Sequence, residues 1–278
     1  MRSDVLDSID VDRFWRRGFA IVRNAYTADE IAAFRRAVDA TDAPKTDLLS
    51  NPHLRSVLTD GRLITVAQRL LNAPTIVYSG DSSFTVGRRQ IGWHKDNADR
   101  DDAQAPDWQG RYTILRFGLY LQDHRWHTGG LNLRAASHMT TDLSAGRCRY
   151  VRSGLGDLVV WSLRTTHSGN GMLLRMPWGV HPPPHRQRSI PGWAAAPSPA
   201  GGRMALFAAL GLDDAHHRRY AEYLRTRTYM VDIWRNSRYD DEAKRAAADA
   251  GLEVWDMPLS IDGDPDAGAA VDWAPLPY

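Results

Sequence analysis

The sequence predicts a mainly β protein, a sandwich or barrel, with flanking helices. Three observations predict this class. Short β-prone runs separated by turns fill residues 75–212, helical apolar periods precede and follow them, and no repeat of fixed length is visible. Because the β-prone runs follow one another without intervening helices, a parallel sheet built from βαβ units is disfavoured.

The N-terminal flank, residues 1–74, combines helices with one strand. A short helix from Val11 and a strand "FAIVRN" come first. Thr27 and Glu30 then form a capping box ahead of an amphipathic run, which predicts a helix beginning near Ala28. The run "LRSVLTDGRLITVAQRLLN" predicts another helix, broken or bent near Gly61.

The β core, residues 75–212, contains five β-prone runs: "TIVYSGDSSFTV", "RYTILRFGLYLQ", "GGLNLRAAS", "GDLVVWSL" and "GRMALFAALG". A loop-like insertion at 171–202 interrupts the core and holds seven of the 15 prolines. Long loops in compact domains are often functional, so we expect this insertion to cover the barrel mouth. The alternative is a surface excursion without a role.

The C-terminal flank, residues 213–278, returns to the helical period. The runs "DDAHHRRYAEYLRTRTYMVDIW" and "DDEAKRAAADAG" predict helices, the second ending near Gly251. The tail from Val254 is rich in Pro, Asp and Gly and should run over the surface. Together with the N-terminal flank and the core, this segment is expected to form a single domain, 1–278.

Composition narrows the classes of function. The chain has 278 residues, 43% of them hydrophobic and 24% charged, with a net charge of +2. This near-neutral charge predicts no nucleic-acid partner. Cys148 is the only cysteine, so neither an internal disulfide nor a Cys-rich zinc site is available. No run approaches the roughly 18 apolar residues of a membrane span, and we expect a soluble protein of the cytoplasm.

The motif "IGWHKD" carries two candidate metal ligands. Positions i and i+2 of a strand share a face, so His94 and Asp96 would point the same way. This His-x-Asp occurs once, about as often as chance allows, so its context must supply the evidence. A third candidate, His167, ends the β-prone run "GDLVVWSLRTTHSGN" 71 residues after Asp96. Two histidines and one carboxylate can bind Fe(II) on one face and leave other positions open.

Arg203 begins the last β-prone run of the core. An arginine that projects into a barrel is costly unless it meets a carboxylate, usually through a bidentate pair. Arg203 is therefore a candidate for binding an acidic ligand.

The order and spacing of these segments resemble a known family. "GWHKD", "GGLNLRAASH", "GDLVVWSLRTTHSGN" and "GRMALF" are similar to motifs of the phytanoyl-CoA dioxygenase-like Fe(II)/2-oxoglutarate oxygenases, and the resemblance covers roughly residues 12–212. It implies a double-stranded β-helix, the jelly-roll core also found in cupins. It further implies that His94, Asp96 and His167 hold Fe(II), that Arg203 grips the distal carboxylate of 2-oxoglutarate, and that O2 is the oxidant.

One departure from the family concerns the arginine. In most members it follows the second histidine by about a dozen residues, whereas Arg203 follows His167 by 36. Arg175, eight residues after His167, is the alternative.

A narrower resemblance concerns the substrate. "FGLYLQDHRWHTGGLNLRAASH" and "LRTTHSGN" are similar to a bacterial branch that acts on sugars, including oxygenases of orthosomycin and hygromycin-type antibiotic biosynthesis. This implies a small-molecule substrate, a sugar or an aminoglycoside, oxidised by hydroxylation or by closure of an orthoester ring.

Two other classes remain open at the level of sequence. A cupin-type metalloenzyme, a hydrolase or isomerase, would use the same three ligands without Arg203. A non-catalytic carbohydrate-binding sandwich would depend on the ten tryptophans, whose rings offer flat apolar surface with a polar N–H.

Overall fold

The computed structural model describes residues 9–41, 45–87, 92–187 and 189–268. Its helices are α2 (Val11–Arg17), α3 (Ala28–Asp39), α4 (Ser56–Thr59), α5 (Arg62–Leu71), α6 (Pro184–Gln187), α7 (Ala215–Arg225), α8 (Thr228–Arg235), α9 (Asp241–Asp249) and α10 (Met257–Ser260), with 3-10 turns η1 (Pro106–Trp108), η2 (Ser137–Met139) and η3 (Gly192–Ala194). Its strands are β1 (Phe19–Val22), β2 (Ile76–Tyr78), β3 (Ser82–Val86), β4 (Ile114–Tyr120), β5 (Gly130–Ala135), β6 (Arg147–Tyr150), β7 (Leu158–Ser162), β8 (His167–Gly171), β9 (Met204–Gly211) and β10 (Leu252–Val254).

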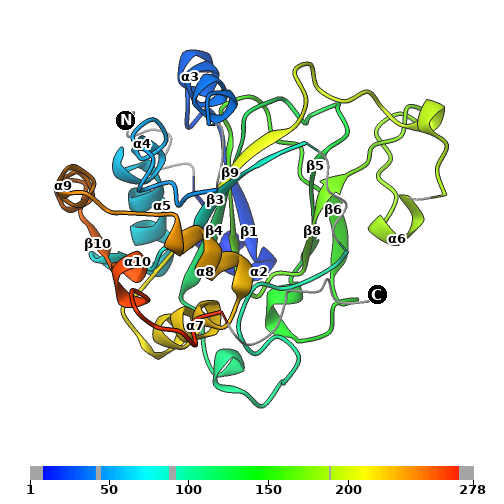
Figure 1. Ribbon diagram of the computed structural model, residues 1–278. Coiled ribbons are helices and arrows are strands. Elements are labelled where there is room, and N and C mark those ends of the chain that lie inside the picture. The colour runs from blue at the N-terminus through cyan, green and yellow to red at the C-terminus, as the bar shows by residue number, and fades with distance from the viewer. Residues whose placement is uncertain (1–8, 42–44, 88–91, 188, 269–278) are drawn as a thin grey trace.

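The strands form two sheets that face each other (Figure 1). The larger sheet has the order β1-β7-β4-β9-β2-β10, with β3 also paired to β9, and the smaller sheet has the order β6-β5-β8. Antiparallel pairs form the centre of the larger sheet, β4 lying between β7 and β9. The result is a sheet-rich core with flanking helices, as the sequence predicts.

Alternation along β4 separates two apolar layers. Phe117 and Leu119 pack with residues of α3, α4, α5 and α9 on the outer face of the larger sheet. Tyr120 points the other way, into a cluster that joins both sheets and includes Trp161 of β7 and Leu133 of β5. Successive strand residues point to opposite faces, so Arg116 and Tyr120 share the inner face.

Several local predictions are confirmed. Thr27 caps α3, and the reciprocal capping box with Glu30 is present. The predicted helix after Leu54 is broken at Gly61, whose φ of 83° is the left-handed conformation that glycine adopts without steric cost. Two strands escaped prediction: β6, in the segment "RCRY", and β10, which pairs with β2 just before the expected surface tail.

The insertion at 171–202 packs outside the smaller sheet and does not cover the space between the sheets (Figure 1). Its Leu173 and Ala196 form an apolar cluster with Tyr150 of β6. The described part of the insertion therefore forms an excursion on the outer surface, and the expected cover over the barrel mouth is not seen in it.

No helix within the described ranges is long and apolar enough to cross a membrane.

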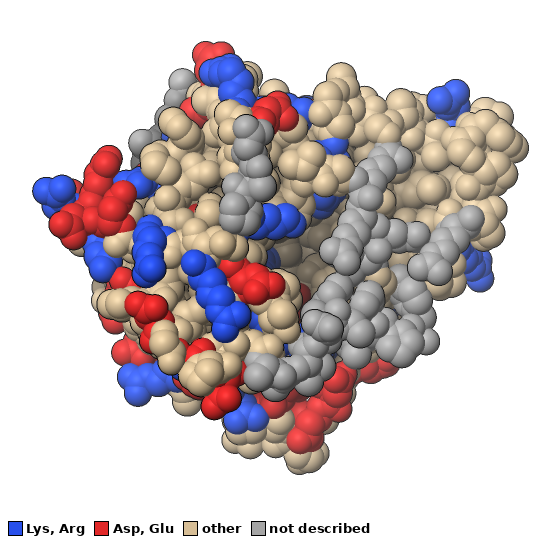
Figure 2. Space-filling model, in the orientation of Figure 1, with Lys and Arg blue, Asp and Glu red and all other residues tan. Residues whose placement is uncertain are grey.

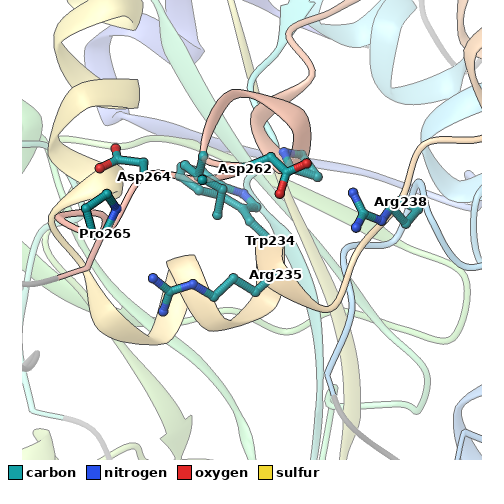
Figure 3. Close-up of a pocket in the computed structure, with 9 residues that line it drawn as sticks. Trp234, Arg235, Arg238, Asp262, Asp264 and Pro265 are labelled. Atoms are coloured by element: carbon teal, nitrogen blue, oxygen red, sulfur yellow. The ribbon is translucent and has the colours of Figure 1, made fainter.

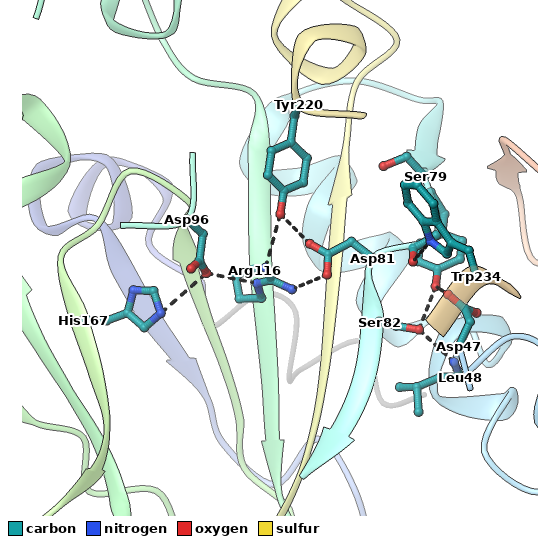
Figure 4. Close-up of polar contacts among 12 residues, drawn as sticks. Asp47, Leu48, Ser79, Asp81, Ser82, Asp96, Arg116, His167, Tyr220 and Trp234 are labelled. Atoms are coloured by element: carbon teal, nitrogen blue, oxygen red, sulfur yellow. Dashed lines mark hydrogen bonds and ion pairs between the residues drawn. The ribbon is translucent and has the colours of Figure 1, made fainter. Parts of the chain in front are cut away.

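A buried carboxyl group, Asp47, ties the N-terminal flank to the larger sheet (Figure 4). It accepts hydrogen bonds from the Leu49 amide at 2.7 Å and from the Tyr78 hydroxyl. Burial raises the pKa of Asp47 to about 7, although these hydrogen bonds oppose the shift. Its protonated form therefore predominates in the folded state at mildly acidic pH, while the unfolded chain ionises near pH 4.

This shift predicts a pH-dependent stability. The contribution of Asp47 is fully present below about pH 4 and is lost as the pH rises through 7, by up to roughly 4 kcal/mol in the free energy of unfolding. Asp47→Asn should abolish this loss, which urea unfolding between pH 4.5 and 8 would measure as the difference from wild type. The exposed Asp249→Asn is the control. Parallel pH profiles for wild type and Asp47→Asn would contradict the prediction.

Candidate metal centre

His94, Asp96 and His167 come together at one end of the space between the sheets. One ligand atom from each lies within 4.8 Å of the other two. The Nε2 atom of His94 is 3.7 Å from Asp96 Oδ1. The Nε2 atom of His167 is 3.5 Å from Asp96 Oδ2, as Figure 4 shows. Ligands about 2.1 Å from one ion and at right angles to each other are about 3 Å apart, so this arrangement is close to a metal-binding face.

Backbone pairing creates this convergence. His94 and His167 form an antiparallel bridge, in which the His94 amide donates to the His167 carbonyl at 3.1 Å and the His167 amide donates back at 2.9 Å. Residues opposed in such a bridge project to the same side, and the two ring centroids are 4.2 Å apart. The expected strand at His94 is reduced to this bridge, and His167 begins β8 where the sequence suggested the end of a strand. Ile91 of the quoted motif lies outside the described residues.

Both imidazoles are oriented through the nitrogen that faces away from Asp96. His94 Nδ1 lies 2.8 Å from the Gly92 carbonyl, and His167 Nδ1 lies 3.0 Å from the Thr165 carbonyl. A carbonyl only accepts, so each Nδ1 carries a proton, and Nε2 is the nitrogen that faces Asp96 and could bind a metal. Burial lowers the pKa of His167 to about 4, against the opposing effect of Asp96, so this imidazole is neutral at pH 7.

Trp161 fixes the His167 ring from the larger sheet. The two ring centroids are 5.4 Å apart. The indole itself lies over Gly118 of β4, where an added Cβ would be 3.0 Å from the Trp161 ring. Glycine in the middle of β4 thus allows the close approach that places Trp161 beside the imidazole.

Arg116 of β4 points toward Asp96. Its Nε is 3.4 Å from Asp96 Oδ2, and its Nη1 is 2.8 Å from Asp81 Oδ1 (Figure 4). Burial alone would raise the pKa of Asp96, but His167, Arg116 and His94 outweigh it and lower the pKa to about 2. The carboxylate is therefore charged and available as a ligand throughout the physiological range.

Tyr220 of α7 contacts both Asp81 and Arg116 and so helps to hold the Arg116 guanidinium beside Asp96. Its hydroxyl donates to Asp81 Oδ2 at 2.6 Å, and Arg116 Nη2 lies 3.3 Å from the same hydroxyl. Sequence reasoning missed Asp81, in the turn between β2 and β3, and Tyr220, on α7, because neither segment shows a local metal-site pattern. The only usable signal was the charged Arg116 inside an apolar strand.

Substitution of Arg116 should weaken the metal centre without removing a ligand. We expect Arg116→Gln to lower metal affinity about 10- to 100-fold, the usual range for residues that orient ligands, and Arg116→Lys to restore part of it. Titration with Co(II), followed by its visible absorption, would measure this. Arg219→Gln, which removes an exposed ion pair with Asp99, is the control. Unchanged affinity in Arg116→Gln would exclude a positioning role.

Arg203 lies at the other end of β9 and also reaches the inner space. Its Nε donates to the Gly129 carbonyl at 2.9 Å, and its Nη1 donates to Thr85 Oγ1 at 2.9 Å. In the described part of the chain no carboxylate lies within ion-pair distance of Arg203. A guanidinium that is 8% exposed and lacks a counter-charge is suited to an anionic ligand.

Open space lies beside Gly169 of β8, between His167 and the end of β8 that adjoins Arg203. Gly169 follows His167 by two residues on β8, and a Cβ added there would meet no atom within 4 Å. The Gly171 carbonyl accepts from the Gly129 amide, and this bond places Arg203 beside the far end of β8. Figure 2 shows the molecule hollowed on this face, between the helical side and the side of the smaller sheet.

Unpaired polar atoms surround this space. Within the described ranges, Tyr120 Oη, Trp161 Nε1 and Asn170 Oδ1 are buried without a hydrogen-bond partner. Burial raises the pKa of Tyr120 to about 12, which keeps its hydroxyl protonated and able to donate, and the ring packs against Arg203. Buried polar groups are nearly always paired, so three such atoms beside one space indicate a polar ligand or ordered water.

Arg175 and His138 lie away from this space. Arg175, the alternative to Arg203, is exposed on the insertion, where its amide donates to the Ala194 carbonyl. His138 is buried against α2, with Nε2 2.8 Å from the Trp15 carbonyl.

No family model and no curated protein matches this sequence. Solved structures do match. SnoK, described as a non-heme alpha ketoglutarate dependent carbocyclase from nogalamycin biosynthesis, is 17% identical with a TM-score of 0.51, over 77% of this chain and 92% of its own. The chain has the same fold as this structure.

Two further structures support this assignment of fold. HygX from Streptomyces hygroscopicus, solved with nickel and 2-oxoglutarate bound, is 14% identical with a TM-score of 0.53, over 74% of this chain and 88% of its own. AviO1 from Streptomyces viridochromogenes Tue57 is 17% identical with a TM-score of 0.50, over 74% of this chain and 94% of its own. The resemblance seen in the motifs is thus confirmed at the level of fold, and the chemistry has to be argued from the site.

Proposed function

We propose that the protein is a non-haem Fe(II)/2-oxoglutarate-dependent oxygenase that oxidises a small molecule. The observation that carries this proposal is the joint geometry of the inner space. Two imidazoles and one carboxylate converge at one end, and Arg203, which has no carboxylate of the described residues within ion-pair distance, lies at the other. The proposal includes a double-stranded β-helix as the scaffold of the site.

The donor set fits Fe(II). Imidazole nitrogen and carboxylate oxygen suit this ion, and three ligands on one face leave positions for a chelating cosubstrate and for O2. His94, Asp96 and His167 would hold the metal, and Arg116 would orient Asp96 through the Nε contact of 3.4 Å. When bound, Fe(II) with 2-oxoglutarate and O2 supplies the oxidising power, since decarboxylation to succinate and carbon dioxide is coupled to oxidation of a substrate C–H bond.

Arg203 would bind the distal carboxylate of 2-oxoglutarate. Its hydrogen bonds to Gly129 and Thr85 fix the plane of the guanidinium before the ligand arrives, which reduces the entropy lost on binding. The Tyr120 hydroxyl, buried beside it without a partner, would donate a second hydrogen bond. Trp161 and Phe207, whose rings contact each other, would keep water from the space between the two ends.

For the substrate we propose a sugar or an aminoglycoside of antibiotic biosynthesis. The matching structures SnoK and SnoN come from nogalamycin biosynthesis, and SnoN was solved with Fe3+, alpha ketoglutarate and nogalamycin RO. Their stated activities, carbocyclisation and epimerisation, show that one fold serves several oxidative outcomes. Hydroxylation and oxidative ring closure are accordingly both included, and incubation with sugar antibiotic precursors should give a mass gain of one oxygen or a loss of two hydrogens.

The test of the cofactor chemistry is anaerobic addition of Fe(II) and 2-oxoglutarate to the metal-free protein. We expect a weak visible charge-transfer band that needs both additions, followed on admission of O2 by formation of succinate. A protein that binds Fe(II) but gives no band with 2-oxoglutarate would be a cupin-type metalloenzyme. A protein that binds no metal but retains carbohydrate would be the non-catalytic sandwich.

A further inference from the structure

Five arginines line a cleft between α2, β1 and β6, away from the metal centre. The cleft has a volume of about 470 Å³, within the range of small-molecule sites. We call it the arginine cleft, after Arg13, Arg17, Arg23, Arg149 and Arg152. Among the described residues of its lining Asp10 is the only acidic one, and its carboxylate caps α2 by accepting from the Arg13 amide.

Two of the five guanidiniums are already held by the protein. Arg23 forms an ion pair with Asp157, a buried carboxylate. Arg152 donates to the carbonyls of Arg125 and Gly179, and its guanidinium lies over the Trp126 ring. These two form a fixed rim at one end of the arginine cleft.

The other three carry charge that the described part of the chain does not neutralise. Arg13, Arg17 and Arg149 have no carboxylate within ion-pair distance among those residues, and Arg149 Nε is buried without a hydrogen-bond partner. Burial, then Arg13, then Arg149 lower the pKa of Arg17, which shows that these like charges repel one another. Such an arrangement costs free energy in the protein alone and is relieved by an anion placed among the guanidiniums.

The floor of the arginine cleft is apolar. Phe19 and Val151 belong to the cluster between the two sheets, and Arg17 lies over the Phe19 ring at 4.9 Å. The same cluster contains Trp161, whose ring also lies beside the His167 ring. A ligand in the arginine cleft is thus separated from the metal centre by this apolar layer.

A second cavity of the protein differs from the arginine cleft in the balance of its charges. It has a volume of about 370 Å³ and lies between α8 and the segment 258–265 (Figure 3). There Arg235 and Arg238 are balanced by Asp262 and Asp264, and Asp264 is already paired with Arg225. This balance is absent from the arginine cleft, where positive charge predominates.

We propose that the arginine cleft binds an organic phosphate, with the phosphate oxygens on Arg13, Arg17 and Arg149 and the body of the ligand on the apolar floor. Guanidinium matches phosphate through paired hydrogen bonds, and three convergent arginines select for more than one negative charge. The site anchors a phosphorylated ligand outside the metal centre. It does not depend on the proposed oxygenase activity.

The test is calorimetric titration of the metal-free protein, kept in EDTA, with ADP and separately with pyrophosphate. We expect ADP to bind at least about tenfold more tightly than pyrophosphate, because its nucleoside adds contact with the floor. Arg13→Gln/Arg17→Gln should weaken ADP binding at least about tenfold, and Arg149→Lys less than Arg149→Gln. Thermal unfolding checks that each variant is folded.

The matched control is Arg36→Gln/Arg186→Gln, which removes the same charge from exposed positions outside the cleft and should change the Kd less than twofold. Equal affinity for ADP and pyrophosphate would assign the cleft to free phosphate and overturn an organic ligand. Absence of binding by both probes, or equal weakening by the cleft and control variants, would overturn the site itself. Because no metal is present, these outcomes are independent of the iron chemistry.

Discussion

Replacing His167 with alanine is expected to abolish metal binding and with it the turnover of 2-oxoglutarate. His167 supplies one of three ligand atoms, and its Nε2 is held toward Asp96 by the contact between Nδ1 and the Thr165 carbonyl. Even residues that only orient ligands change affinity up to about 100-fold, so loss of a ligand should exceed that factor. The measurement is the Fe(II) content of the reconstituted protein together with succinate formation.

The control for this variant is His216→Ala. His216 lies on α7, where Nε2 contacts the Pro106 carbonyl at 3.3 Å, and its loss should leave iron content unchanged. The visible band with Fe(II) and 2-oxoglutarate should disappear in His167→Ala only. Full iron occupancy in His167→Ala would mean that the three residues do not form the metal centre, and the proposed function would then fail with it.

The Arg203→Ala substitution is expected to separate cosubstrate binding from metal binding. The substitution removes the guanidinium and with it a charge-assisted pair with 2-oxoglutarate worth about 2–3 kcal/mol. This corresponds to a roughly 30- to 150-fold rise in the Kd for 2-oxoglutarate. Iron affinity should stay within about twofold, since Arg203 contacts Gly129 and Thr85 but none of the three ligands. Titration of the charge-transfer band with 2-oxoglutarate measures the first quantity.

Arg175→Ala is the matched control, because Arg175 was the alternative suggested by the sequence and is exposed on the insertion. It should bind 2-oxoglutarate as the wild type does. The reverse pattern, with weakened binding in Arg175→Ala and normal binding in Arg203→Ala, would require the insertion to enter the inner space and would overturn the assignment.

The sequence identified His94, Asp96 and His167 as residues that converge, but it did not reveal the backbone pairing that brings them together. His94 and Asp96 share a face because they are two apart in extended backbone, and this local rule is independent of the rest of the chain. The position of His167 at the start of β8 depends on a turn after β7 that pairs with the His94 segment, and such non-local pairing leaves no local pattern.

The direction of Arg116 shows a second limit. Both faces of β4 are buried, one under helices and one between the sheets, so alternation could not distinguish them. The position of the insertion was mispredicted for a related reason. Its length and proline content indicate a loop but contain no information about which face of the smaller sheet the loop packs on.

The bridge between His94 and His167 has a thermodynamic consequence. His167 follows Asp96 by 71 positions in the chain, so an unfolded polypeptide offers no preformed site for all three ligands. Any ion that these three side chains capture therefore binds only the native state, and mass action raises the apparent melting temperature as the ion is added. At a free ion concentration of 100 times Kd, the free energy of unfolding rises by about 2.7 kcal/mol.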